Sequence, residues 1–189
     1  MLGKSKAWFL AFRPWTFTIF ILPIIEISLW YKKFNNLLLV ILLAILLGSI
    51  TNLLNLYLDN HYCIDLDGES NKILKDKLIN PKSLLNIIYI LILIYIFLVI
   101  YLSRKSIIIL ISLIIALLLS FSYSFTPWNI KTGGFGELLC LISFLLYSIP
   151  MQYLISGKIN SFFVFYTFDN ILVTTSILLL NNIEDIEGD

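Results

Sequence analysis

The sequence predicts an all-α, polytopic membrane helix bundle, and three observations lead to that fold class. The 189 residues are 59% hydrophobic and only 13% charged, whereas a soluble domain is about 45–50% apolar and about 25% charged. The mean hydropathy is +0.93. The apolar residues form long runs that polar segments separate. This composition excludes a disordered chain and argues strongly against a soluble enzyme.

Six segments are long and apolar enough to cross a membrane, since a bilayer core of about 30 Å takes about 20 such residues per helix. In chain order they are 15–31, 37–58, 84–102, 107–125, 138–155 and 162–180. Each is apolar around most of the helix circumference, which is typical of burial in lipid. Runs such as 107–111 do not alternate with a period of two, so these segments are not strands of a membrane barrel.

The first segment follows Lys4, Lys6 and Arg13, which resemble the charged start of a signal peptide. The apolar stretch is too long for one, carries Glu26 and lacks a small-residue cleavage site, so we expect a membrane helix. The second segment ends at a long polar connection, 59–83. A short connection joins the third to the fourth, the Gly-containing segment 126–137 precedes the fifth, and a short connection precedes the sixth.

Six crossings place the N-terminus, the connections 59–83 and 126–137 and the C-terminal segment on one side of the membrane. This side carries most of the Lys and Arg residues, which predicts that it is cytoplasmic. The chain is expected to form a single membrane domain over 1–189. The net charge of +1 is too small to indicate a surface that binds nucleic acid, so we expect no nucleic-acid partner.

Acidic residues gather on the same side, where all but Glu26 and Asp169 lie. Acids hardly influence orientation, so this clustering needs another cause. Asn55 and Asp59 are four residues apart at the end of the second segment, hence on one helix face. A second acidic cluster follows the sixth segment.

Oxygen ligands of this kind suit a hard cation. Two such clusters would fit two Mg²⁺ ions with a diphosphate between them, because Mg²⁺ is held by a few carboxylates together with substrate phosphates. The alternative is that these residues are solvated acids at helix ends. Asparagines on the membrane side of both clusters favour a functional site, since polar groups are costly within a membrane.

The chain resembles the UbiA-type superfamily of intramembrane aromatic prenyltransferases in four blocks that occur in family order. Asn55, Asp59 and Asp65 match the first Asp-rich motif in its longer-spaced form, and Asp185 and Asp189 match the second. Residues 12–16 look like the family's ARPxT start. Residues 123–127, Lys131 and 134–137 look like its connection between helices 4 and 5.

The resemblance implies transfer of a polyprenyl group from a polyprenyl diphosphate to an aromatic acceptor in the lipid bilayer, with two Mg²⁺ ions as cofactors. The implied metal ligands are Asn55, Asp59, Asp65, Asp185 and Asp189. The implied diphosphate ligands are Arg13, Lys72 and Lys131, and Tyr57 and Tyr123 would shield an allylic cation. The alternative is that Arg13 anchors to lipid headgroups, that Lys72 and Lys131 are cations of the cytoplasmic side, and that Tyr123 belongs to an interfacial aromatic belt.

The longer motif spacing and the segment 134–137 favour the 1,4-dihydroxy-2-naphthoate prenyltransferases of menaquinone biosynthesis. The alternatives are a 4-hydroxybenzoate, a glycerol phosphate lipid or a chlorin as acceptor. Leu56, Glu184 and Lys72 depart from the residues usual in the family. The family has about nine membrane helices and this sequence carries six, so we expect a C-terminally incomplete domain. A further alternative is that the chain is a truncated, non-catalytic membrane remnant or subunit.

Overall fold

A computed structural model describes residues 3–62, 72–124, 136–161, 172 and 176, and these residues form helices and connections without a strand. The all-α membrane bundle that the sequence predicts is therefore confirmed. The helices longer than one turn are α1 (Lys4–Phe12), α2 (Phe17–Tyr31), α3 (Leu37–His61), α5 (Pro81–Leu102), α6 (Ile107–Ser124) and α7 (Gly136–Ser156). Three short elements, η1 (Pro14–Thr16), α4 (Lys72–Lys75) and η2 (Ser103–Lys105), complete the described part.

The first predicted segment, 15–31, corresponds to η1 and α2, and the structure adds α1 in front of them. The helical path breaks at Arg13, which adopts a left-handed conformation with φ 49° and ψ 57°, immediately before Pro14. The residue before a proline is disfavoured in the right-handed helical region, which explains why the helix stops here. The chain then resumes as η1 and continues into α2.

The second and third segments are present with longer ends than predicted. Helix α3 continues three residues past the predicted end at 58, so that Asp59 lies within its last turn. Helix α5 begins three residues before 84, at Pro81, because the side chain of Asn80 accepts a hydrogen bond from the Lys82 amide at 2.9 Å. Proline at the first helical position and asparagine at the cap are both favourable there.

The fourth and fifth segments correspond to α6 and α7, whose bounds agree with the prediction to within two residues. The sixth, 162–180, lies outside the described residues except at two positions. Among the residues described, Lys4–Tyr31, Leu37–His61 and Pro81–Leu102 are long and apolar enough to cross a membrane. The shorter apolar helices are Ile107–Ser122 and Leu141–Ser156.

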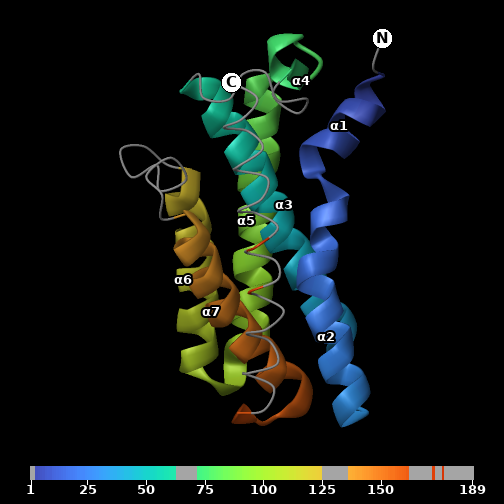
Figure 1. Ribbon diagram of the computed structural model, residues 1–189, viewed down its shortest axis with the longest axis vertical. Coiled ribbons are helices and arrows are strands. Elements are labelled where there is room, and N and C mark those ends of the chain that lie inside the picture. The colour runs from blue at the N-terminus through green and yellow to red at the C-terminus, as the bar shows by residue number, and fades with distance from the viewer. Residues whose placement is uncertain (1–2, 63–71, 125–135, 162–171, 173–175, 177–189) are drawn as a thin grey trace.

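Helix α3 is central to the bundle, because it contacts α1, α2, α5, α6 and α7. Figure 1 shows α1 and α2 in series along one edge, with α6 beside α7 at the other. Helix α1 and the short α4 lie together at one end, which we call the α1–α4 end. The turn from α5 into α6 lies at the opposite end, as the predicted alternation of crossings requires.

Two clusters of buried side chains fill the bundle. The larger joins α2, α3, α5, α6 and α7; there Tyr95 donates a hydrogen bond to the Leu113 carbonyl at 3.0 Å, and Phe20 meets Tyr147 edge to face at 5.7 Å. The smaller, which we call the α1–α3 cluster, lies at the α1–α4 end and consists of Ala7, Ala11, Leu53, Leu56, Ile73, Leu74, Ile79, Leu84 and Ile88. This second cluster holds α1, α4 and the start of α5 against the last turns of α3.

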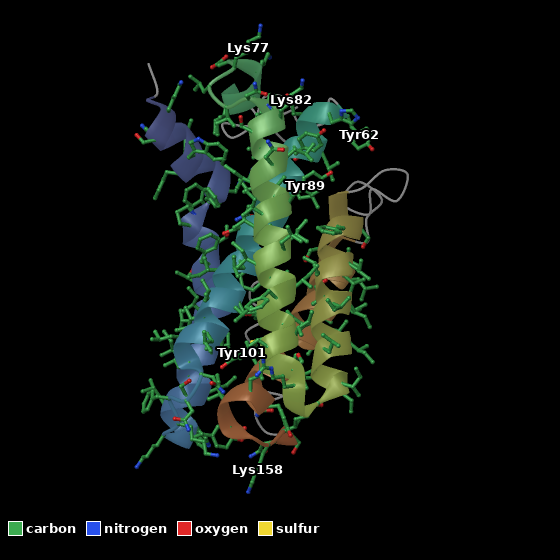
Figure 2. All side chains as sticks on the ribbon, turned by 180° about the vertical axis from the view of Figure 1, so that it is seen from behind. Tyr62, Lys77, Lys82, Tyr89, Tyr101 and Lys158 are labelled. Atoms are coloured by element: carbon green, nitrogen blue, oxygen red, sulfur yellow. The ribbon has the colours of Figure 1, made fainter. Side chains whose placement is uncertain are left out.

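The outer face of α5 shows how the bundle fits a bilayer. Its exposed side chains between Tyr89 and Tyr101 are predominantly apolar. Lys82 and Arg104 lie at its two ends, and 22 residues of helix span about 33 Å, close to the thickness of a hydrocarbon core. Figure 2 shows Lys77, Lys82 and Tyr62 at the α1–α4 end and Tyr101 with Lys158 toward the other.

Candidate functional site

The candidate site lies at the α1–α4 end, on the last turns of α3. Asp59 is only 3% exposed, and Asn55, one turn earlier on the same helix face, is half-buried. A buried carboxylate close to a membrane boundary is costly unless charge or hydrogen bonds compensate it. A side-chain carboxylate and an amide oxygen, one helical turn apart, are both ligands that suit Mg²⁺.

The turn that carries Arg13 lies against this part of α3. Arg13 ends α1, and its amide donates to the Phe9 carbonyl at 3.2 Å. Its carbonyl accepts two hydrogen bonds from Thr16, from the amide and from Oγ1, each at 2.9 Å. These bonds stabilise a left-handed conformation that is about 1–2 kcal/mol unfavourable for a residue with a side chain. The structure thus builds a specific turn around a residue that the sequence selected as a diphosphate ligand.

Asn52 connects α3 to that turn, and the sequence analysis did not select it. Its Nδ2 donates to the Phe12 carbonyl at 2.8 Å and to the Thr16 hydroxyl at 2.9 Å. Asn52 lies three residues before Asn55, so the two share a helix face. The signal that could have revealed it is a third polar side chain on one face of an otherwise apolar membrane helix.

Close packing of α2 against α3 occurs one turn further into the membrane, at Gly48. A Cβ atom built on Gly48 would lie 3.1 Å from Cδ1 of Phe17 and 3.4 Å from Cε2 of Phe20. Gly48 and Asn52 are four residues apart and therefore lie on one face. This face of α3 receives α2 and the Arg13 turn together.

Leu56 occupies the position where the family often has an aspartate, and the structure gives a physical reason for leucine. The side chain is 1% exposed and belongs to the α1–α3 cluster, among Ala7, Ala11 and Leu53. A carboxylate at this position would be surrounded by apolar atoms. Position 56 is therefore a packing position in this chain.

Tyr57 lies on a different face of α3 from Asp59, because residues two positions apart are rotated by about 200° around the helix axis. Its ring stacks on His61 with centroids 6.0 Å apart and an interplanar angle of 5°. His61 in turn meets Tyr62 edge to face at 4.9 Å. The stacked pair Tyr57 and His61 therefore lies at the helix end, away from the face that carries Asn55 and Asp59.

Several predicted site residues lie outside the described part of the chain, namely Asp65, Lys131, Asp185 and Asp189. Lys72 begins α4, and Tyr123 lies in the last turn of α6. Within the described ranges, no group of three or more His, Cys, Asp or Glu side chains could hold a metal ion. The described residues therefore contribute one carboxylate and one amide, and the other predicted ligands stay a prediction.

One family model covers most of the chain. A family model described as the UbiA prenyltransferase family matches residues 14–189. No curated protein and no solved structure matches the chain. The matched range includes the Arg13–Thr16 turn from Pro14 onward and both Asp-rich segments. The chain belongs to the UbiA prenyltransferase family, whose members are membrane prenyltransferases.

Proposed function

We propose that this chain transfers a polyprenyl group from a polyprenyl diphosphate to 1,4-dihydroxy-2-naphthoate, as a step of menaquinone biosynthesis. The observation that carries the proposal is the buried carboxylate of Asp59 beside Asn55, at the end of a membrane helix, with the Arg13 turn held against that helix. Family membership supports the reaction class. The spacing of Asn55, Asp59 and Asp65 and the segment 134–137 support the naphthoate acceptor.

The α1–α4 end suits a diphosphate electrostatically. Lys75, Lys77 and Lys82 are exposed there, and the positively charged Arg13 lies in the turn that is held against α3. Such cations attract a polyanionic headgroup and hold its oxygens by charge-assisted hydrogen bonds. We propose Arg13, Lys72 and Lys131 as the residues that bind the diphosphate.

The reaction breaks the bond between the allylic carbon and the diphosphate oxygen, and the electron pair leaves with the diphosphate. A carbon of the acceptor ring then bonds to the allylic carbon, and the ring regains aromaticity by losing a proton or carbon dioxide. The apolar helices exclude water, which would otherwise capture the allylic cation. We propose that Tyr123 shields that cation with its ring face, whereas Tyr57 is occupied by its stack with His61.

The residues present fit Mg²⁺, because the buried Asp59 carboxylate and the Asn55 amide offer only oxygen ligands. We propose that Asn55, Asp59 and Asp65 hold one ion and that Asp185 and Asp189 hold a second. Bound Mg²⁺ would supply positive charge that stabilises the departing diphosphate and a template that orients it.

The test compares Asp59→Asn with Asp76→Asn, which removes an exposed carboxylate at the same end of the bundle. We expect Asp59→Asn to weaken Mg²⁺-dependent binding of farnesyl diphosphate by about 10- to 100-fold, and Asp76→Asn to leave it unchanged. Binding is measured by isothermal titration calorimetry on the 189-residue chain in lipid nanodiscs. Equal binding by Asp59→Asn and the unsubstituted chain would contradict the proposed site.

The acceptor is tested separately, by incubating the chain with radiolabelled prenyl diphosphate and either 1,4-dihydroxy-2-naphthoate or 4-hydroxybenzoate. We expect a prenylated product from the naphthoate alone. A product from 4-hydroxybenzoate would leave the reaction class in place and replace the acceptor. Binding of the diphosphate without product from any aromatic acceptor would favour a non-catalytic binding protein.

A further inference from the structure

Asn52 makes two hydrogen bonds that join parts of the chain about 40 residues apart. Its Nδ2 donates to the Phe12 carbonyl at 2.8 Å and to the Thr16 hydroxyl at 2.9 Å, so both amide hydrogens are used. The Phe12 carbonyl belongs to the last turn of α1, where carbonyl oxygens lack helical partners. Asn52 therefore caps α1 from α3 and holds η1 in the same interaction.

The Thr16 hydroxyl continues this chain of hydrogen bonds to Arg13. It accepts from Asn52 and donates to the Arg13 carbonyl at 2.9 Å. A hydroxyl has one hydrogen to donate and lone pairs to accept, so both bonds form at once. The path from Asn52 through Thr16 thus ends on the residue whose left-handed conformation, with φ 49°, sets the direction of the turn.

The location of the turn brings Arg13 within reach of the site. Asn55 and Asp59 lie about 4.5 Å and about 10.5 Å beyond Asn52 along α3, from the rise of 1.5 Å per residue. The Arg13 backbone begins at the peptide bond whose carbonyl Asn52 binds. A diphosphate held at Asn55 and Asp59 would therefore lie at a distance that the long arginine side chain spans.

We propose that Asn52 is a positioning residue, which holds the Arg13 turn against α3 so that the guanidinium group binds the diphosphate of the prenyl donor. This inference rests on the proposed function, because it assigns Arg13 to the donor's diphosphate. Asn52 acts on the substrate only through the turn. Loss of its amide removes the two hydrogen bonds that tie the left-handed turn to α3.

The first part of the test asks whether Asn52 holds the turn, independently of any substrate. The rings of Phe9 and Trp15 meet across the turn at 6.1 Å, and Trp15 is 53% exposed, so its environment reports on the geometry of the turn. The chain has four tryptophans, and labelling with 5-fluorotryptophan gives each its own ¹⁹F resonance. The resonance that disappears in Trp15→Phe is assigned to Trp15. We expect Asn52→Leu to shift the Trp15 resonance and Asn86→Leu, at an exposed position on α5, to leave it unmoved.

A second pair of variants covers the case in which Asn52→Leu fails to fold. Thr16→Val keeps the shape of the side chain and removes both of its hydrogen bonds, whereas Thr16→Ser keeps the hydroxyl. We expect Thr16→Val to shift the Trp15 resonance. Thr16→Ser should leave that resonance where it lies in the unsubstituted chain. An unmoved resonance in both Asn52→Leu and Thr16→Val would overturn the inference.

The second part measures the dissociation constant for farnesyl diphosphate. We expect Asn52→Leu to weaken binding about tenfold, the size expected for the loss of one favourable charge-assisted interaction. In an Arg13→Gln background, Asn52→Leu should cause little further loss, because both substitutions remove the same contact. Additive losses would overturn the inference, since Asn52 would then act without Arg13.

The two parts separate failure of this inference from failure of the proposed function. If the unsubstituted chain does not bind farnesyl diphosphate, the proposed function fails, and the role of Asn52 toward a diphosphate fails with it. If the chain binds and Asp59→Asn weakens binding while Asn52→Leu binds as tightly as before, the proposed function stands and the inference is overturned.

Discussion

Replacing Leu56 with aspartate restores a residue that the family often has, and the structure predicts that the substitution damages the protein. Leu56 is 1% exposed among the side chains of the α1–α3 cluster. Removing most of a buried leucine costs about 2–5 kcal/mol through the cavity that it leaves. A carboxyl group surrounded by apolar atoms and left without hydrogen bonds adds about 1–3 kcal/mol. The sum, about 5 kcal/mol, is comparable with the whole stability of many domains.

The assay is unfolding of the chain in mixed micelles by increasing the proportion of dodecyl sulfate, followed by circular dichroism. Leu56→Ala measures the cavity alone, Leu56→Asn adds a polar group, and Leu56→Asp adds charge. We expect stability to fall in that order, without tighter binding of Mg²⁺. A Leu56→Asp chain as stable as the unsubstituted one, or one that binds Mg²⁺ more tightly, would refute the view that position 56 serves packing.

Three further predictions concern the rest of the bundle, and each is measured by the same unfolding assay. Gly48→Leu should lower the free energy of unfolding by about 1–3 kcal/mol, because a Cβ alone would meet Phe17 at 3.1 Å. Glu26→Leu should raise it by about 1–3 kcal/mol, because within the described part of the chain the buried Oε2 of Glu26 has no hydrogen-bond partner. Lys33→Met should lower it by about 1 kcal/mol, because the ammonium group donates to the Ser156 carbonyl at the end of α7 at 2.6 Å.

A matched control, a contradicting outcome or both accompany each of these predictions. Lys32→Met removes the neighbouring exposed cation and should leave stability unchanged, so an equal loss from Lys32→Met and Lys33→Met would count against the contact with α7. Glu26→Gln keeps the shape and removes the charge, and it should stabilise less than Glu26→Leu. A stable Gly48→Leu chain would show that α2 can move away from α3 without penalty.

The helices themselves were predictable from the sequence, because each membrane helix must satisfy its backbone hydrogen bonds within a long apolar run. The ends were less predictable, because they depend on single polar contacts. Asn80 and Pro81 start α5 earlier than hydropathy indicates, and α3 continues through the polar residues up to His61. Helix α1 was not predicted, because its nine residues are too short to stand out as a span.

The site was predictable only in part. The spacing of Asn55 and Asp59 indicates a shared helix face, and the structure has both in the last two turns of α3. The same spacing cannot show that Leu56 packs against α1 or that Tyr57 stacks on His61, because both depend on neighbours that the fold supplies. Asn52 was missed because its partners, Phe12 and Thr16, are 40 and 36 residues away.

Hydropathy and motif spacing are local properties of the chain, and they were enough to predict a helical membrane protein of the prenyltransferase type. Which polar residues act together depends on the tertiary structure. It joined the Arg13 turn to α3 through the amide of Asn52, and it buried Asp59 at the same end of the bundle. Hydrogen bonds between distant residues form only where packed helices bring their atoms within about 3 Å, and no local pattern encodes that approach.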